Sequence, residues 1–444
     1  MKSTCNPFEH SSFYSRRDFM SVILQGSLAA GLAAKGTSVL AGEAPKPAQD
    51  VKNLPGFGAA KHVIYVMLSG GFSQLDSFNI IPDARDEVRG ETKPLPTNVD
   101  GIQMGHWFPR LAQHMDKIAI VNSRISRIGA HAKGQYYVRT AYERRGADTH
   151  PHLGAWMDKL LDPLSDQLPS NFLVNAPSYH PNNGWLHPKH APLPITDPEK
   201  GLQNSKRYPG VTDERLLKRF SMSKTLGERF RNKYLNDEVQ TVAPLYDDAL
   251  TMMRSEDLAA FDLSQEDSWK HEAYGENRLG QGLLLARRLV ERGVRHVEVN
   301  YGGWDNHNAI YSERTFPEKS RHVDQAMASL LEDLDKSGLL KDTLVVLTSE
   351  FGRTPEVNQN LGRDHWPKSF SCLLAGAGVK TGQVYGKTDK EGVEILENKI
   401  DTPDWCATIA HIVGLPWNET FFSPSGRPFK PGGKRGQAHV GLLA

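Results

Sequence analysis

Four side chains that can do chemistry lie close together in residues 345–371, VVLTSEFGRTPEVNQNLGRDHWPKSFS. They are Glu350, Arg353, Asp364 and His365. Carboxylates and imidazoles bind divalent metal ions, and the planar guanidinium of Arg353 suits a clamp on an oxyanion such as phosphate or sulfate. The alternative is an ordinary solvated loop after a strand. Other parts of the chain must decide between a loop and a site.

Acidic and imidazole side chains also follow two other apolar runs. SGGFSQLDSFN comes after residues 62–68, and YGGWDNHN comes after residues 294–300. If these runs are parallel strands, their carboxyl ends lie at the edge where open α/β sheets bind ligands. Mixed nitrogen and oxygen ligands favour zinc, then manganese or iron, whereas calcium prefers oxygen alone. The predicted metal ligands are Asp76, Asp305, His307, Glu350, Asp364 and His365, with Asp364 either a ligand or the partner that orients His365.

Apolar, β-branched runs alternate with amphipathic helical stretches along most of the chain. This alternation is typical of an α/β fold with a mostly parallel sheet covered by helices on both faces. Residues from about 200 to 275 are helical and charged, and are predicted to form an insertion or cap. The predicted strands are residues 62–68, 118–123, 171–176, 294–300, 343–349 and 369–376.

Composition excludes several classes of partner. The chain has 444 residues, of which 39% are hydrophobic and 24% charged, enough for one large or two ordinary domains. Because 53 Lys and Arg nearly balance 52 Asp and Glu, the net charge of +1 offers no field that attracts nucleic acid or anionic lipid. Cys5, Cys372 and Cys406 have no metal-finger spacing. We therefore expect no nucleic-acid partner.

The N-terminal segment has the features of an export signal. Arg16 and Arg17 precede a weakly apolar run that ends in VLA at residue 41, which resembles a twin-arginine signal peptide over residues 1–41. The run is too short for a membrane span of roughly 20 residues. A chance arginine pair before an amphipathic helix is the alternative. We expect periplasmic or other export through the twin-arginine pathway, a linker at residues 42–61, and no membrane span in the mature chain.

Four motifs, LSGGFSQLDSF, GGWDNH, SEFGRTP and GRDHW, occur in this order. Together they resemble the signatures of the domain-of-unknown-function 1501 family, a relative of the alkaline phosphatase and sulfatase superfamily. DTPDWCATIAHIVGLP is similar to the segment that closes the sulfatase catalytic domain. The resemblance implies an alkaline-phosphatase-like three-layer α/β/α sandwich over residues 62–420, followed by a C-terminal tail at residues 421–444.

Two positions depart from the superfamily pattern. Phe351 stands where a second metal-binding histidine is expected, so a single metal ion or an altered pair is implied. His131 lies nine residues before Thr140, at the position of the superfamily's nucleophile. A histidine there could accept a phosphoryl group, bind the metal or act as a general base. The alternative is a histidine that packs at a helix start.

The expected function is that of an exported, metal-dependent hydrolase-like protein acting on a phosphate or sulfate ester of a small molecule or a glycan. His131 and Arg353 are its predicted catalytic residues. The alternative is a catalytically silent metal-binding protein of the same fold that binds a glycan or a partner protein. The oligomeric state stays open.

Overall fold

The computed structural model describes residues 50–146, 148–203, 205, 210–233, 249 and 251–444. The predicted signal peptide and residues 42–49 of the predicted linker lie outside the described residues, as does part of the predicted insertion. Residues 50–444 group into one unit by their contacts. Among the described residues, no helix is long and apolar enough to cross a membrane.

An eight-stranded sheet forms the centre of this unit, in the order β12-β4-β11-β8-β1-β7-β5-β6. Only β11 runs against its neighbours, β4 and β8, and all other adjacent pairs are parallel. The predicted, mostly parallel sheet is thus confirmed, and the short edge strands β6 and β12 complete it. The strands are β1 His62–Ser69, β4 Ile118–Arg124, β5 Asn171–Val174, β6 Leu193–Ile195, β7 His296–Gly302, β8 Thr343–Thr348, β11 Phe370–Gly376 and β12 Gln383–Tyr385.

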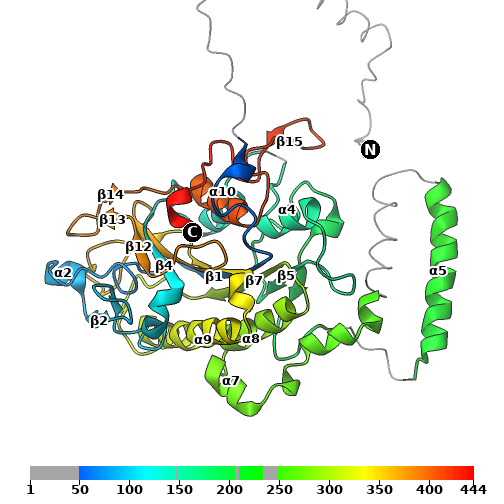
Figure 1. Ribbon diagram of the computed structural model, residues 1–444, viewed down its shortest axis with the longest axis horizontal. Helices are drawn as coiled ribbons and strands as arrows, with labels where there is room; N and C mark the ends of the chain where they lie inside the picture. Colours follow the sequence, from blue (N-terminus) through cyan, green and yellow to red (C-terminus); the bar gives the residue numbers. More distant parts are fainter. Residues whose placement is uncertain (1–49, 147, 204, 206–209, 234–248, 250) are drawn as a thin grey trace, which may run out of the picture. The chain divides into compact units, whose positions relative to one another are not determined.

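Helices cover both faces of the sheet (Figure 1). Successive side chains of a strand point to opposite faces, so β1 buries Ile64 and Val66 in one core and Val63 and Tyr65 in the other. The first core is closed by α8 and α9, and the second by α3, α4 and α10. The predicted three-layer arrangement is therefore confirmed. The five helices are α3 His131–Thr140, α4 Leu153–Leu160, α8 Arg278–Glu291, α9 Phe316–Lys336 and α10 Thr402–Ile412.

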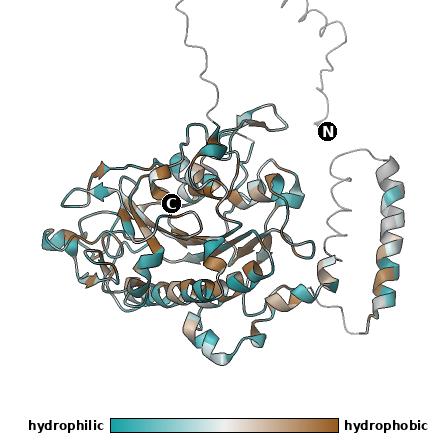
Figure 2. Ribbon diagram, in the orientation of Figure 1, coloured by the Kyte–Doolittle hydropathy of each residue, from teal (hydrophilic) through white to brown (hydrophobic). Residues whose placement is uncertain are grey.

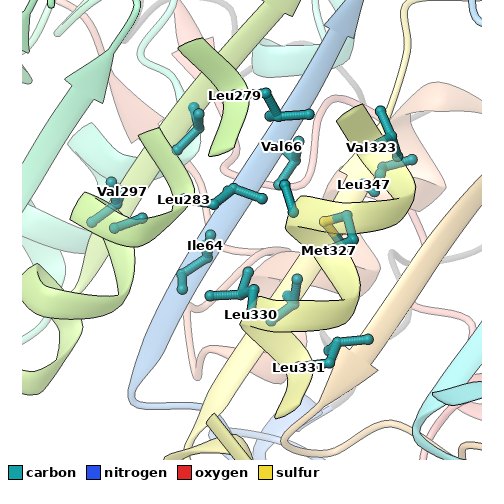
Figure 3. Packing of buried hydrophobic residues seen from close by; sticks show 14 of the residues in the cluster. Ile64, Val66, Leu279, Leu283, Val297, Val323, Met327, Leu330, Leu331 and Leu347 are labelled. Carbon is teal, nitrogen blue, oxygen red and sulfur yellow. The ribbon is translucent and has the colours of Figure 1, made fainter. Parts of the chain in front are cut away.

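The first core shows why α8 and α9 lie on the sheet. Hydrophilic and hydrophobic residues alternate along both helices, as expected for helices with one buried face (Figure 2). Leu283 of α8 and Met327 of α9 point toward Ile64 and Val66 of β1 (Figure 3), and all four side chains are fully buried. Burying a side chain of this size contributes about 1.5–3 kcal/mol.

Shorter elements surround the sheet. The described part of the predicted insertion contains α5 and α7, and the predicted C-terminal tail contains the β15–β16 hairpin and the buried residues Leu442 and Leu443. These elements are α2 Asp86–Arg89, α5 Asp213–Lys233, α7 Ser268–Tyr274, β2 Pro94–Pro96, β3 Gln103–Gly105, β9 Gly352–Arg353, β10 His365–Trp366, β13 Lys387–Thr388, β14 Ile395–Glu397, β15 Phe421–Phe422 and β16 Pro428–Phe429.

The carboxyl ends of β1, β7 and β8 meet at one edge of the sheet, and two glycines let their loops touch. Gly70 and Gly71, directly after β1, have φ of +123° and +78°. A Cβ at Gly70 would lie 2.7 Å from Trp304 N, and one at Gly71 would lie 2.9 Å from Arg353 Nε. Only glycine permits these conformations and this approach. The loop after β1 therefore lies against the loops after β7 and β8.

Candidate metal centre

Three histidine rings surround one carboxylate oxygen at this edge. The Nε2 atoms of His131, His307 and His365 lie 3.2, 2.9 and 3.2 Å from Asp305 Oδ1. The Nε2 atoms of His307 and His365 are 3.0 Å apart. Two ligands that each lie about 2.0–2.2 Å from one zinc-like ion are themselves about 3–3.5 Å apart. The ligand atoms of His131, Asp305 and His365 all lie within 4.8 Å of one another, as in a ligand set, and His307 lies beside them.

The other ring nitrogen of each histidine faces a hydrogen-bond acceptor. An acceptor there fixes the proton on Nδ1 and leaves a lone pair on Nε2, which is the form that binds a metal ion. His131 Nε2 is buried and makes no hydrogen bond among the described residues. The residues therefore fit a bound cation. The acceptors are Glu350 Oε1 for His131 at 2.7 Å, Asp364 Oδ1 for His307 at 2.5 Å and Gly129 O for His365 at 2.7 Å.

The position of His131 follows from the packing of α3. His131 is the first residue of this helix, as its sequence context predicts, and its ring centroid lies 4.3 Å from that of His365. One turn further along, a Cβ at Gly134 would lie 3.2 Å from Glu350 Cβ, so α3 lies close against the segment that follows β8. Phe351 packs beneath the rings, with its centroid 4.9 Å from His131 and 4.7 Å from His365. A phenyl ring thus occupies the place of a second metal-binding histidine.

Glu350 supports the site from below. Its side chain is buried, and its Oε1 accepts hydrogen bonds from Gly70 N at 2.9 Å and from the His131 ring. Glu350 was predicted as a ligand, whereas its observed contact is with Nδ1 of His131. This hydrogen bond raises the pKa of His131, although burial of the ring opposes it. Glu350 therefore positions His131 and strengthens its Nε2 as a donor of electrons.

Arg353 holds Asp305 rather than an open binding position. Its side chain is buried, and Nη2 donates to Asp305 Oδ1 at 2.5 Å. Nε donates to Gly71 O at 2.8 Å and Nη1 to Arg363 O at 2.8 Å. Burial raises the pKa of Asp305, but the hydrogen bonds from Arg353 and His365 outweigh burial and lower it. The predicted anion clamp is replaced by a buried support for the central carboxylate.

The contact made by Asp364 differs from both of its predicted roles. Asp364 was predicted as a ligand or as the partner that orients His365, and it instead accepts a hydrogen bond from His307. That hydrogen bond lowers the pKa of Asp364. His365 is placed by the β9–β10 pair, in which it lies opposite Arg353. The pairing of two very short strands thus sets the direction of this ring.

Asp76 does not join the other predicted ligands. Its carboxylate is fully buried and forms an ion pair with Arg363, whose Nε and Nη2 lie 2.8 and 3.1 Å from its two oxygens. Thr92 and Tyr311 also donate hydrogen bonds to Asp76, at 2.9 and 2.7 Å. A carboxylate with this many donors and a paired arginine has no lone pair left for an ion. Its prediction as a ligand missed Arg363, which lies inside the GRDHW motif.

The ligand set is open to solvent on one side. The exposed fractions of the side chains are 46% for Asp305, 38% for His307, 28% for His131 and 26% for His365. Buried structural metal sites are closed, whereas catalytic sites keep an open position. A substrate can therefore approach the site from the side of Asp305 and His307, the two most exposed of these residues.

A second group of possible ligands lies in the interior. Atoms of His152, His180 and Glu298 lie within 4.8 Å of one another. His180 Nδ1 lies 3.0 Å from Asn182 N and 2.9 Å from Asn182 Oδ1, and His180 Nε2 lies 3.2 Å from Glu298 Oε2. Arg139 Nε donates to the other Glu298 oxygen at 2.8 Å. This group is a buried ion pair that the sequence did not reveal.

Solved structures with a related arrangement have low identity to this chain. A sulfatase from Pseudoalteromonas sp., PsFucS1, has a TM-score of 0.43 and 14% identity, with 87% of this chain and 72% of that chain covered. The lipoteichoic acid synthase LtaP from Listeria monocytogenes has a TM-score of 0.39 and 10% identity, with 83% and 78% covered. An alkaline phosphatase superfamily protein from Vibrio parahaemolyticus has a TM-score of 0.36 and 10% identity, with 82% and 69% covered.

No curated protein sequence matches the chain. A family model does match it, over residues 60–440, and this range includes the eight-stranded sheet and every residue of the candidate metal centre. The match extends past residue 420 into the predicted C-terminal tail. The chain therefore belongs to the family described as protein of unknown function (DUF1501).

Proposed function

We propose that this protein is an exported, metal-dependent hydrolase that acts on a phosphate or sulfate ester. The observation that carries the proposal is the convergence of three histidine Nε2 atoms on Asp305 Oδ1, each with its Nδ1 bound to an acceptor. Zinc is the ion that this donor set suits best, with manganese and iron next. The choice of phosphate or sulfate rests on the resemblance of the four motifs to the alkaline phosphatase and sulfatase superfamily.

His131, Asp305, His307 and His365 would hold the ion. When bound, a divalent ion supplies Lewis-acid catalysis by stabilising the charge that develops on an ester oxygen. Asp305 stays ionised because Arg353 donates to it. Glu350 and Asp364 keep the protons of their partner histidines on Nδ1.

Water is the nucleophile that this arrangement favours. Both nitrogens of His131 face carboxylate oxygens, of Glu350 and Asp305, so the ring is not free to accept a phosphoryl group. Ser126 Oγ is bonded within its own turn, to Ile128, and Ser73 Oγ donates to Asp76 at 2.5 Å. Ser126 is the serine nearest in sequence to His131, the expected nucleophile position, and Ser73 lies in the loop after β1. We therefore propose direct hydrolysis without a covalent intermediate.

The test is metal analysis of the purified mature protein, combined with hydrolysis assays on 4-nitrophenyl phosphate, bis(4-nitrophenyl) phosphate and 4-nitrophenyl sulfate. We expect about one divalent ion per chain, and turnover that EDTA removes and added zinc or manganese restores. His365→Ala should lose both ion and turnover, and His114→Ala is the matched histidine control. Bound metal without turnover of any ester would favour the silent binding protein instead, and absence of metal would overturn the proposal.

Export is proposed from Arg16 and Arg17, which lie outside the described residues. Changing both to Lys should leave the precursor in the cytoplasm, because the twin-arginine pathway reads this pair. Fractionation followed by immunoblotting measures the outcome. Normal export of the double variant would contradict the proposal, and a precursor without residues 1–41 serves as the control for cytoplasmic retention.

A further inference from the structure

An open cavity of about 400 Å³ lies at the carboxyl ends of β1, β5 and β7, beside the candidate metal centre. Three of its lining residues connect directly to that centre along the chain. Ser69 precedes Gly70, whose N–H binds Glu350, and Gln135 lies one helical turn after His131. Gly302 ends β7, just before the loop that carries Asp305. A substrate whose reacting group lies at the centre can therefore extend into this cavity.

The cavity wall contains polar atoms that the protein leaves without partners. Asn300 is 6% exposed, and its Nδ2 makes no hydrogen bond among the described residues. Ser69 Oγ is likewise buried and without a described partner. Leaving such groups unpaired is unfavourable, so a bound group that pairs with them is favoured. Amide and hydroxyl groups of this kind match the hydroxyl groups of a sugar, which both donate and accept.

The amide of Asn300 has a fixed orientation. Its Oδ1 accepts a hydrogen bond of 2.6 Å from Arg139 Nη2, and Arg139 is itself held by Glu298 at 2.8 Å. The Arg139 and Glu298 side chains are 1% and 2% exposed, so this support is rigid. The Asn300 NH2 group consequently points away from Arg139. The interior ion pair thus prepares a donor at the cavity wall before any ligand binds.

A charged group and an aromatic ring lie at the rim. Arg278 is exposed and is anchored by Asn175 Oδ1, at 3.3 Å from Nε and 3.2 Å from Nη2, and by Thr196 O at 2.6 Å. Its Nη1 is not used in these contacts. Tyr179 is 69% exposed on the same lining. An anchored guanidinium suits a sulfate, phosphate or carboxylate substituent, and an exposed phenol ring offers an apolar face with a polar tip.

We propose that this cavity is the binding site for a sugar ring of an anionic glycan, with Asn300, Ser69 and Gln135 binding hydroxyl groups and Arg278 binding an acidic substituent. This substrate class rests on the proposed function in one respect only, namely that the ester to be cleaved lies at the neighbouring metal centre. Binding itself requires no turnover. The lining combines the apolar surfaces of two tyrosines, Ala176 and Pro177 with amide, hydroxyl and guanidinium side chains, a mixture that suits the apolar faces and polar edges of a sugar ring.

The test is binding of the full mature chain, with EDTA present, to an array of sulfated, phosphorylated, uronic and neutral oligosaccharides, followed by calorimetry with the tightest binder. We expect an acidic oligosaccharide to bind, and Arg278→Gln to raise its Kd by at least about tenfold, the scale of a lost charged hydrogen bond. Asn300→Asp keeps an oxygen for Arg139 but removes the donor, and should weaken binding similarly. Arg292→Gln, directly after the other end of α8, should bind like the wild type.

The outcomes separate this proposal from the proposed function. Binding of an acidic glycan that Arg278→Gln and Asn300→Asp both weaken supports the cavity assignment, whether or not any ester is hydrolysed. Binding only to neutral glycans, to none of the array, or equally to wild type and both variants would overturn it. Metal-dependent turnover of aryl esters could still stand in that case, because it depends on the histidines and Asp305.

Discussion

Two groups of histidine and carboxylate lie among the described residues, and they differ in exposure to solvent and in the partners of their carboxylates. Around Asp305, three rings turn Nε2 lone pairs inward, since each Nδ1 donates to an acceptor. Around Glu298, Arg139 Nε donates to Oε1 at 2.8 Å and His180 Nε2 lies 3.2 Å from Oε2, so both carboxylate oxygens already have partners. The partners of the carboxylate distinguish an open ligand set from a buried ion pair.

Both groups also contain an arginine, and its surroundings differ. Arg353 donates to Asp305 but shares its other N–H groups among backbone carbonyls, and Asp305 stays 46% exposed. Arg139 and Glu298 are enclosed together, and although burial raises the pKa of Glu298, Arg139 and His180 together outweigh burial and lower it. A buried pair of this kind is neutral without an ion. The comparison shows that clustered residue types do not identify a metal site until the partners of each carboxylate are known.

The largest expected effect is at the centre itself. Asp305→Asn keeps the shape of the side chain but removes the charge that three imidazoles face. We expect metal content and any esterase turnover to fall by more than the roughly 10–100-fold loss that follows a change in an outer partner. Mass spectrometry of bound metal and the ester assays measure this. The control is Asp335→Asn, which changes an exposed carboxylate on α9. Retained metal in Asp305→Asn would contradict the assignment of the ion to the group around Asp305.

A substitution in the interior group should lower the free energy of unfolding and leave the metal content unchanged. Glu298→Gln leaves Arg139 charged and enclosed without an anion, which costs about 3–5 kcal/mol for a buried pair. Urea denaturation should show this loss in the free energy of unfolding, while metal content per folded chain stays at the wild-type level. If Glu298→Gln lost metal with unchanged stability, the interior group would be a metal site after all.

An intermediate effect is expected at Glu350, which contacts His131 rather than the ion position. Glu350→Gln retains an oxygen that can accept from His131 Nδ1, but it lacks the negative charge that strengthens the ring as a ligand. Metal affinity should fall by about 10–100-fold, as measured by competition with a chelating dye. Glu356→Gln, 63% exposed, is the matched control. A complete loss of metal would instead make Glu350 a direct ligand.

The smallest expected effect is on the pH dependence of stability. It involves His152, which belongs to the interior group, and His296 beside it. Burial lowers the pKa of His296 to about 4 and that of His152 well below its ordinary value. The folded pKa lies below the unfolded value of about 6.5, so the unfolded chain gains protons first, and stability falls as pH drops from about 6.5 to 4. His296→Gln should reduce that slope by up to about 1.4 kcal/mol per pH unit. Denaturation at a series of pH values measures it, and unchanged slopes would contradict the prediction.

The sheet could be predicted from the sequence because its central strands are built around apolar, β-branched runs. Residues 343–349 and 62–68 are of this kind, and the glycines after the second run mark the point where the backbone must turn. The strands β6 and β12 have only three residues each, so they carry no such pattern. Local sequence therefore predicted the layers and the functional edge, and missed the edges of the sheet.

The candidate centre could be predicted only in part, because a side chain's role depends on its partner. Asp76, like Asp305, lies in a loop that begins with two glycines at the end of a strand. Its arginine lies 287 positions away, and no local pattern reveals that pairing. Gly129 O, which fixes the proton of His365, carries no side-chain signal at all. Spacing identified the loops that meet, and tertiary hydrogen bonding assigned the roles.

The separation of the ligands along the chain has a consequence for folding. Glu350 and His131 are 219 positions apart, and His365 and Gly129 are 236 apart, so neither contact can form before the central strands have paired. Contacts this distant in sequence form late, because loop-closure entropy must be overcome first. An ion that binds only the assembled centre then draws the equilibrium toward the completed fold, by about 2.7 kcal/mol at a hundredfold excess over its Kd. Metal supply and the yield of folded chain would be linked, even for a variant without catalytic activity.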